Sequence, residues 1–128
     1  MAKRLIRAEG AALPLGAYSQ GWRAGDFVFV TGTGPIDPDG KVVGETIEEQ
    51  TEKTIDNIEM ILEAGGASLS DVVKVNVHLI DTNLFQRYNT VYKGRFKEPY
   101  PARTTVGSDL HQVPGMLIEI DCIAYVGD

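Results

Sequence analysis

Two charged residues near the C-terminus have surroundings that could support chemistry. Arg103 follows Pro101 and begins a β-branched run, which predicts the start of a strand. Glu119 lies where acidic and apolar residues alternate, which predicts a strand with one apolar face. An arginine can hold a carboxylate through two parallel hydrogen bonds, and a nearby glutamate could polarise a water or move a proton. The same two residues could equally form a surface ion pair that contributes about 0–1 kcal/mol, so the pattern alone leaves both interpretations open.

A loop that contains Pro114 and Gly115 separates the two predicted strands. Such a loop would let the strands pair as a hairpin, and we therefore expect Arg103 and Glu119 near one end of one sheet. His111 lies in the same loop and has no Cys or His neighbour at ligand spacing. We expect His111 to be solvated and predict no metal site.

Hydrophobic periodicity predicts the element order β-ββ-α-β-α-ββ. The expected strands span residues 1–7, 17–23, 27–31, 72–80, 101–107 and 116–126, and the expected helices span 46–65 and 83–96. Thr46 and Glu49 fit a capping box at the start of the first helix. The stretch 32–40 is rich in Gly, Pro and Asp, so it is expected to form a loop. Alternation in the strand over 72–80 places Val73 on its apolar side and His78 on its polar side, so His78 is expected to be a polar-face residue.

This order favours an α+β fold: one mixed sheet with both helices on one face, forming a single two-layer domain over residues 1–128. The strands around Val28 and Ile118 are too apolar to face water, so the other face of the sheet also needs cover. We therefore expect a homo-oligomer. Clefts between its subunits would be natural binding sites for small molecules.

Charge and composition exclude several classes of protein. The net charge of −6 disfavours a nucleic-acid partner, because phosphate binding normally requires a basic stripe. The single cysteine, Cys122, precludes an internal disulfide and is expected to be a small buried hydrophobe. No apolar run resembles a signal peptide or approaches the ~20 residues of a membrane span, so we expect a cytoplasmic protein that does not contact a membrane.

Several motifs, taken in order, resemble the RidA/YjgF/L-PSP family over nearly the whole chain. They are Gly-Ala-Tyr-Ser-Gln at 16–20, Phe-Val-Thr-Gly at 29–32, Gly-Pro-Ile-Asp-Pro-Asp-Gly at 34–40, the helix segment 49–58, the strand segment 71–77, Phe-x-x-Tyr-Asn-x-x-Tyr at 85–92, Pro-Ala-Arg-Thr-Thr-Val at 101–106 and Ile-Glu-Ile-Asp-Cys-Ile-Ala at 118–124. The resemblance implies a chorismate-mutase-like α+β fold with a six-stranded sheet and two helices. It also implies a homotrimer with its sites between subunits.

The resemblance also implies an activity. Members of the family that carry the arginine are enamine/imine deaminases. They hydrolyse 2-aminoacrylate (2-iminopropanoate), 2-iminobutanoate and related 2-imino acids to 2-oxo acids and ammonia, without a cofactor. By this resemblance the chain is a 2-iminobutanoate/2-iminopropanoate deaminase-like hydrolase whose partners are a small imino or oxo acid and two further copies of itself.

The family's site residues fall on named positions of this chain. Arg103 falls on the arginine that clamps the substrate carboxylate, and Glu119 on the acid associated with the attacking water. Tyr18 falls on a tyrosine that lines the pocket, and Asn89 on a helix asparagine near the same site. Gly32 falls on a backbone position that can face the substrate nitrogen. Asn89 could instead bond within its helix or across the oligomer, and Tyr18 could be interface packing.

Two departures from the family pattern bear on specificity. Many members carry Cys two residues after the arginine, whereas this chain has Thr105, so we expect a changed pocket polarity rather than a loss of activity. The loop over 108–115 also differs from the Arg-Leu-Pro motif that is common in the family, and it could help to set substrate size.

Three alternatives stay open. The first is a specialised catabolic deaminase acting on aminoacrylate from pyrimidine breakdown or on an aminomuconate-type acid. The second is a ribonuclease or translation inhibitor, which the acidic net charge argues against. The third is a trimer that binds 2-oxo acids for regulation without turnover, because binding requires only the arginine clamp.

Overall fold

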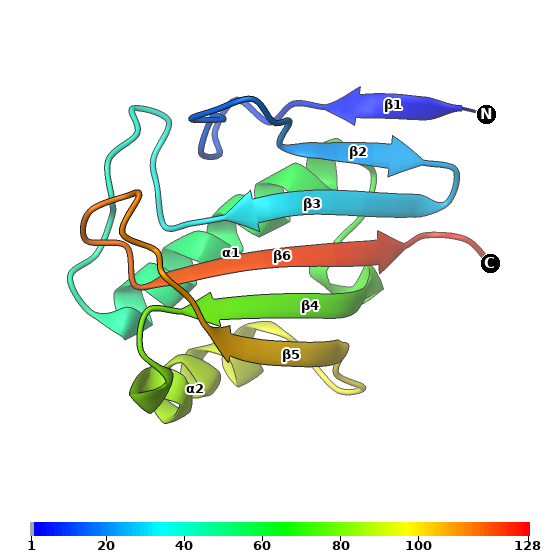
Figure 1. The fold of residues 1–128 in the computed structure, drawn as a ribbon. Coiled ribbons are helices and arrows are strands. Elements are labelled where there is room, and N and C mark those ends of the chain that lie inside the picture. The colour runs from blue at the N-terminus through cyan, green and yellow to red at the C-terminus, as the bar shows by residue number, and fades with distance from the viewer. Residues whose placement is uncertain (1) are drawn as a thin grey trace.

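The computed structural model describes residues 2–128, and in it two helices cover one face of a six-stranded mixed sheet (Figure 1). The strands are β1 (Lys3–Ile6), β2 (Gly21–Ala24), β3 (Phe27–Thr33), β4 (Val72–Leu79), β5 (Ala102–Gly107) and β6 (Ile118–Tyr125), and the helices are α1 (Ile47–Ala64) and α2 (Phe85–Arg95). The strand order across the sheet is β1-β2-β3-β6-β4-β5. β4 and β5 run parallel, and the other described pairs are antiparallel. The predicted element order and fold class are confirmed.

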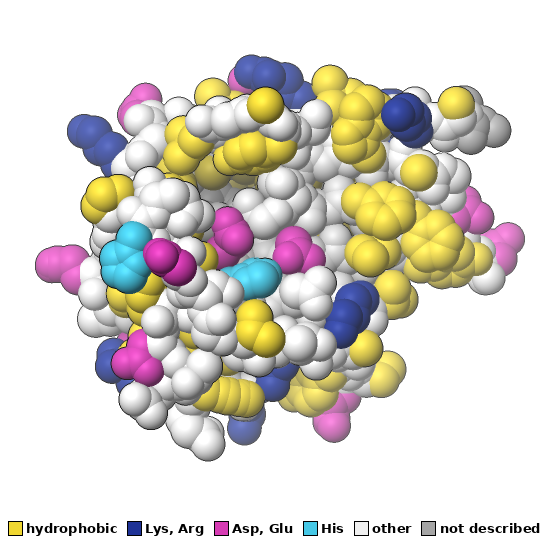
Figure 2. Space-filling view, in the orientation of Figure 1, with side chains coloured by type: hydrophobic (Ala, Val, Ile, Leu, Met, Phe, Trp, Pro, Cys, Tyr) yellow, Lys and Arg dark blue, Asp and Glu magenta, His cyan; other side chains and the backbone are white. Residues whose placement is uncertain are grey.

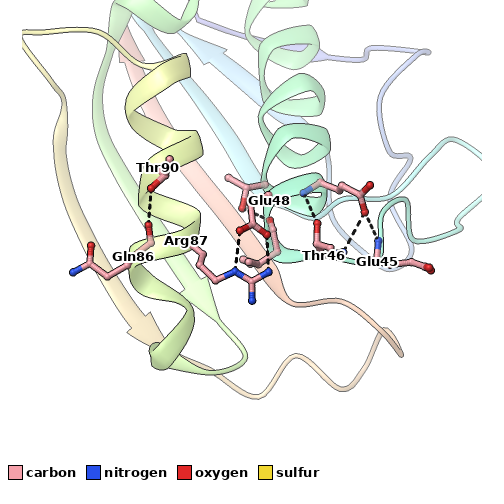
Figure 3. A network of polar contacts seen from close by, with 9 residues as sticks. Glu45, Thr46, Glu48, Gln86, Arg87 and Thr90 are labelled. Atoms are coloured by element: carbon pink, nitrogen blue, oxygen red, sulfur yellow. Dashed lines mark hydrogen bonds and ion pairs between the residues drawn. The ribbon is translucent and has the colours of Figure 1, made fainter.

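A capping box marks the start of helix α1, and a glycine follows its last turn. The predicted capping box is present: the Glu49 amide donates to Thr46 Oγ1 over 3.1 Å, and the Thr46 amide donates to Glu49 Oε1 over 3.2 Å (Figure 3). Gly65 follows the last turn, and a Cβ at this position would stand 2.6 Å from Ile6 Cδ1. Glycine is therefore required there by the close approach of β1 to the helix end.

Helix α2 is tied to α1 by ion pairs on the surface. Arg87 on α2 forms a two-bonded pair with Glu48 on α1, with distances of 2.7 and 2.8 Å (Figure 3). These hydrogen bonds lower the pKa of Glu48 to about 2. The helix predicted from residue 83 begins at Phe85, because a short 3₁₀ turn over Thr82–Leu84 precedes it.

The core lies between the sheet and the helices. Alternate residues of the three central strands pack beneath apolar positions of α1 and buried aromatic positions of α2. The core includes Val28, Val30, Val75, Val77, Leu79, Ile118, Ile120 and Cys122 from the sheet, and Ile55, Ile58, Ile61, Leu62, Tyr88 and Tyr92 from the helices. The expectation that Cys122 is buried is confirmed, and burial raises the pKa of its thiol to about 12.

The predicted hairpin of the last two strands is wrong, because β4 lies between β5 and β6. The segment that contains α2 crosses over the sheet and lets β5 pair in parallel with β4, as β-helix-β connections commonly do. The loop after β5 then passes over the end of β4 before β6 begins (Figure 1). Arg103 and Glu119 are therefore not on adjacent strands.

Two predicted strand boundaries also need correction. The strand expected from Ala17 begins at Gly21, because the buried Gln20 side chain bonds back to the preceding loop through Ala8 and Ala12. The loop expected from Gly32 begins later, since β3 continues through Thr33.

The apolar side of β4 differs from its expected pattern at the first residues. Val73, expected in the core, is 47% exposed, and Val72 is buried instead. A register shift between Val72 and Lys74 against β6 explains the difference, because an extra residue reverses the alternation at that point.

The sheet face away from the helices, here called the open face, is visible in Figure 2. Val28 and Ile118, which were expected to make it apolar, point to the helices instead. The open face carries Phe27, Phe29 and Tyr125, which pack against one another and are each about two-fifths exposed. Polar and acidic side chains occupy its centre (Figure 2). Among residues 2–128, no helix combines the length and the apolar character that a membrane crossing needs.

The capping box gives a stability prediction. Replacing Thr46 with Ala should lower the free energy of unfolding by about 1 kcal/mol, because the Glu49 amide loses its acceptor. Urea unfolding at fixed protein concentration measures the change. Thr90→Ala is the control, since Thr90 only back-bonds to Gln86 in the middle of α2. An equal loss in both variants would contradict the assignment of the cap.

Candidate active site

The predicted site residues fall into two separate cavities. Tyr18, Gly32 and Glu119 line one of about 450 Å³, here called the glutamate cavity. Asn89 and Arg103 line another of about 420 Å³, here called the arginine cavity. Among the described residues of a single copy, the two cavities share no lining residue.

Sheet geometry explains the separation. Arg103 is in register with Val75, whose side chain faces the helices, so Arg103 lies on the helix side of β5. Glu119 is in register with His78 and alternates with the buried Ile118, so it lies on the open face of β6. The two side chains thus point to opposite sides of the sheet, with β4 between their strands.

Arg103 is held by aromatic rings rather than by an acid. Its guanidinium lies 4.5 Å from the ring centre of Tyr92, 5.3 Å from that of Phe85 and 5.5 Å from that of Tyr88. Nη1 donates to Asn89 Oδ1 over 2.7 Å. None of the ion pairs within residues 2–128 includes Arg103, so its charge is uncompensated and most of its donors are unused. Such a group is suited to receiving a carboxylate.

The tyrosines around Arg103 stay neutral at physiological pH. Burial raises the pKa of Tyr92 to about 12, with Arg103 acting in the opposite direction. Burial also raises the pKa of Tyr88. The Tyr88 hydroxyl lies 2.6 Å from Thr105 Oγ1, so Thr105 is engaged by Tyr88 and does not line either cavity. Asn89 bonds to Arg103 rather than within its own helix.

Glu119 owes its position to a glycine. A Cβ at Gly32 would stand 3.0 Å from both Cδ and Oε2 of Glu119, so a side chain there would push the carboxylate out of its place. Gly32 lies where β3 and β6 change register, between Val30 and Thr33. Partial burial raises the pKa of Glu119, Asp121 raises it further and His78 lowers it. A carboxylate with a raised pKa is better able to take up and return a proton.

The rest of the glutamate cavity is largely apolar. Tyr18 is 47% exposed, and its hydroxyl accepts a hydrogen bond from the Leu15 amide over 3.0 Å. Apolar residues from three loops, those between β1 and β2, between β3 and α1 and between β5 and β6, make the wall: Leu13, Leu15, Ile36, Val113 and Met116. The sequence marked the loop over 108–115 as a possible determinant of substrate size, and Val113 of that loop does line the cavity. No sequence pattern indicated that Leu15 or Met116 would line this cavity, because apolar loop residues have no distinguishing pattern.

His111 is exposed in that loop and pairs with Asp109 over 2.7 Å. His78, by contrast, lies on the open face with two acids of β6 beside it.

The comparisons with known proteins agree with this fold. A family model described as Endoribonuclease L-PSP matches residues 9–126. The chain belongs to this family. A RutC family protein of Pyrococcus abyssi is 49% identical over 127 residues, which cover 98% of both chains. Chloroplastic Reactive Intermediate Deaminase A of Arabidopsis thaliana is 40% identical over 127 residues, which cover 95% of this chain and 65% of that protein.

A solved structure extends the agreement. A Thermotoga maritima protein described as an endoribonuclease has a TM-score of 0.91 to this chain at 42% identity, covering 98% of both chains. The resemblance to the RidA/YjgF/L-PSP family is thereby confirmed. Its members bear deaminase, RutC and endoribonuclease names, so the activity of this L-PSP member must be argued from its own residues.

The raised pKa of Glu119 gives a prediction about pH. The folded chain binds this proton more tightly than the unfolded chain, so ionisation of Glu119 costs stability as the pH rises above the ordinary value of 4.5. The stability advantage of Glu119→Gln over the parent should therefore grow between about pH 4 and pH 7 and then level off. Urea unfolding of both proteins across this range measures it. A constant difference would show that the carboxylate is not perturbed.

Proposed function

We propose that this chain is an enamine/imine deaminase that hydrolyses 2-imino acids to 2-oxo acids and ammonia. The proposed substrates are small acids such as 2-aminoacrylate (2-iminopropanoate) and 2-iminobutanoate. The observation that carries the proposal is the uncompensated guanidinium of Arg103, which rings and Asn89 hold in place at a cavity. The 40% identity to a relative named a reactive intermediate deaminase supports the same class of reaction.

The proposal requires at least two copies of the chain. Arg103 and Glu119 face opposite sides of the sheet, so they can act on one substrate only if each comes from a different subunit. We propose a homotrimer in which the arginine cavity of one copy meets the glutamate cavity of the next. The exposed rings of Phe27, Phe29 and Tyr125 on the open face support an interface there, because such clustered aromatic exposure is typical of protein contacts.

The residues have distinct roles in the proposed hydrolysis. Arg103 binds the substrate carboxylate and fixes the position of the adjacent imine carbon. A water beside Glu119 attacks that carbon: the new C–O bond forms while the C=N π electrons move to nitrogen, and Glu119 accepts the water proton. Glu119 returns the proton to the nitrogen. The C–N bond then breaks as the hydroxyl becomes the carbonyl, and ammonia leaves with the hydroxyl proton.

The surroundings of Glu119 fit this cycle. Its carboxylate has no hydrogen bond or ion pair within residues 2–128, so it is free to bind a water. The Gly32 backbone beside it has no side chain to exclude the substrate nitrogen, and Tyr18 lines the same cavity. The net charge of −6 and the apolar cavity wall argue against RNA as the substrate, despite the endoribonuclease description of the family model.

Replacing Arg103 tests the proposal. A threonine dehydratase would supply the imine, semicarbazide would trap what is not hydrolysed, and 2-oxo acid release would be followed. Arg103→Ala should lose at least about 100-fold in kcat/KM, because two hydrogen bonds to a charged carboxylate contribute about 1.5–3 kcal/mol each. Arg103→Lys should retain only part of the activity, since lysine lacks the planar fork.

Arg87→Ala is the matched control, because Arg87 lies on α2, which also carries Asn89, but pairs with Glu48 at the surface instead of facing the cavity. It should keep the parent activity. A parent protein that does not accelerate 2-oxo acid release would overturn the deaminase proposal. An Arg103→Ala variant that keeps the parent activity would show that Arg103 has no role in the proposed reaction.

A further inference from the structure

A cluster of polar side chains on the open face surrounds His78, which the proposed cycle does not use. His78 and Glu119 are direct partners across β4 and β6, so their side chains stand next to each other on the same face. His78 Nε2 lies 3.7 Å from Asp121 Oδ2, and Nδ1 lies 2.7 Å from Ser108 Oγ. Figure 2 shows histidine and acidic side chains gathered at the centre of this face.

One nitrogen of the His78 ring has a hydrogen-bond partner, and the other faces an acid at ion-pair distance. Ser108 follows β5, and its amide donates to the Leu79 carbonyl over 2.8 Å, which anchors the hydroxyl beside the ring. Asp121 is itself held by Asn76, whose Nδ2 donates to Asp121 Oδ1 over 2.9 Å. His78 is therefore partly buried between a hydroxyl and an acid. His111, whose side chain is 80% exposed, has only its loop neighbour Asp109.

The charges around His78 are acidic on one side and neutral on the other. β6 contributes Glu119 and Asp121. β5 contributes Thr104 and Val106, which are in register with Asn76 and His78. The other cation that β4 presents on this face is Lys74, and its Nζ donates to Thr104 Oγ1 over 2.9 Å, towards β5. His78 is therefore the basic side chain of β4 that faces Glu119.

We propose that His78 is a positioning residue for Glu119. Its ring is hydrogen-bonded to Ser108 and flanked by Asp121, and it faces Glu119 across the strand pair, where it helps to place the carboxylate at the glutamate cavity. The inference rests on the proposed deaminase function, which gives Glu119 its role. It adds a residue that the sequence pattern placed only on a polar face.

The physical effect is a balance of two influences on one carboxyl group. Burial and Asp121 raise the pKa of Glu119, and the His78 charge opposes them. An imidazole carries its positive charge at acidic pH, where Glu119 would otherwise take up a proton and stop acting as a base. His78 thus extends the activity to lower pH. Its effect should disappear at alkaline pH, where an imidazole has no charge to act on a carboxylate.

His78→Gln tests the inference, with His111→Gln as the matched control. In His78→Gln the acid limb of the kcat/KM profile should move to higher pH while the alkaline plateau is retained; His111→Gln should follow the parent. Ser108→Ala, which frees the ring at Nδ1, should give a smaller shift in the same direction and serves if His78→Gln does not fold. A profile of His78→Gln or Ser108→Ala that coincides with the parent overturns the inference, while an active parent leaves the proposed function intact.

A second measurement does not depend on activity. Carbon-13 NMR of the Glu119 side-chain carboxyl, assigned with Glu119→Gln, gives the midpoint of its titration in each protein. The midpoint should rise in His78→Gln and stay unchanged in His111→Gln. If the parent lacks deaminase activity, the proposed function is overturned, but a rise would still support an electrostatic interaction between His78 and Glu119. An unchanged midpoint would overturn the inference itself.

Discussion

The position of β4 between β5 and β6 is the constraint on which the rest of the site depends. Because β5 pairs with β4 in parallel, Arg103 takes the helix side of the sheet with Val75. Because β6 pairs with the other edge of β4, Glu119 takes the open face with His78. One copy of the chain therefore holds the candidate carboxylate receptor and the candidate base in separate cavities. In the proposed account, catalysis is a property of the assembly rather than of the fold alone.

The Arg103 guanidinium and the Glu119 carboxyl are each held in surroundings that do not favour the stability of the folded chain. Arg103 has rings and an amide around it instead of a counter-ion, and Glu119 is partly desolvated over Gly32. Unpartnered charges and shifted carboxyl groups of this kind cluster at functional sites. The core between the sheet and the helices supplies the stability, and it needs neither residue. The site can therefore keep a free charge and a raised pKa without loss of the fold.

Local chemistry in the sequence predicted most of the elements and their one-sided helix layer. The α1 boundaries followed from Thr46, Glu49 and the glycines after the helix, which act within a few residues. The pairing of β5 was missed, because a crossover is decided by tertiary packing, and the loop that contains Pro114 and Gly115 is equally compatible with a hairpin. The exposure of Val73 was missed because a register shift between strands does not change the alternation of apolar and polar residues in the sequence. Arg103 and Glu119 were found through the family motif, but their separation could be seen only in the sheet.

Subunit complementation tests the central claim most directly. Arg103→Ala and Glu119→Gln, each inactive alone, would be unfolded together, refolded as mixed oligomers and assayed for 2-oxo acid release. If Arg103 of one subunit and Glu119 of the next share a site, random mixing of equal amounts should restore about one quarter of the parent sites. Activity that stays at the level of the separate variants, while mixed oligomers are shown to form, would contradict a site shared between subunits.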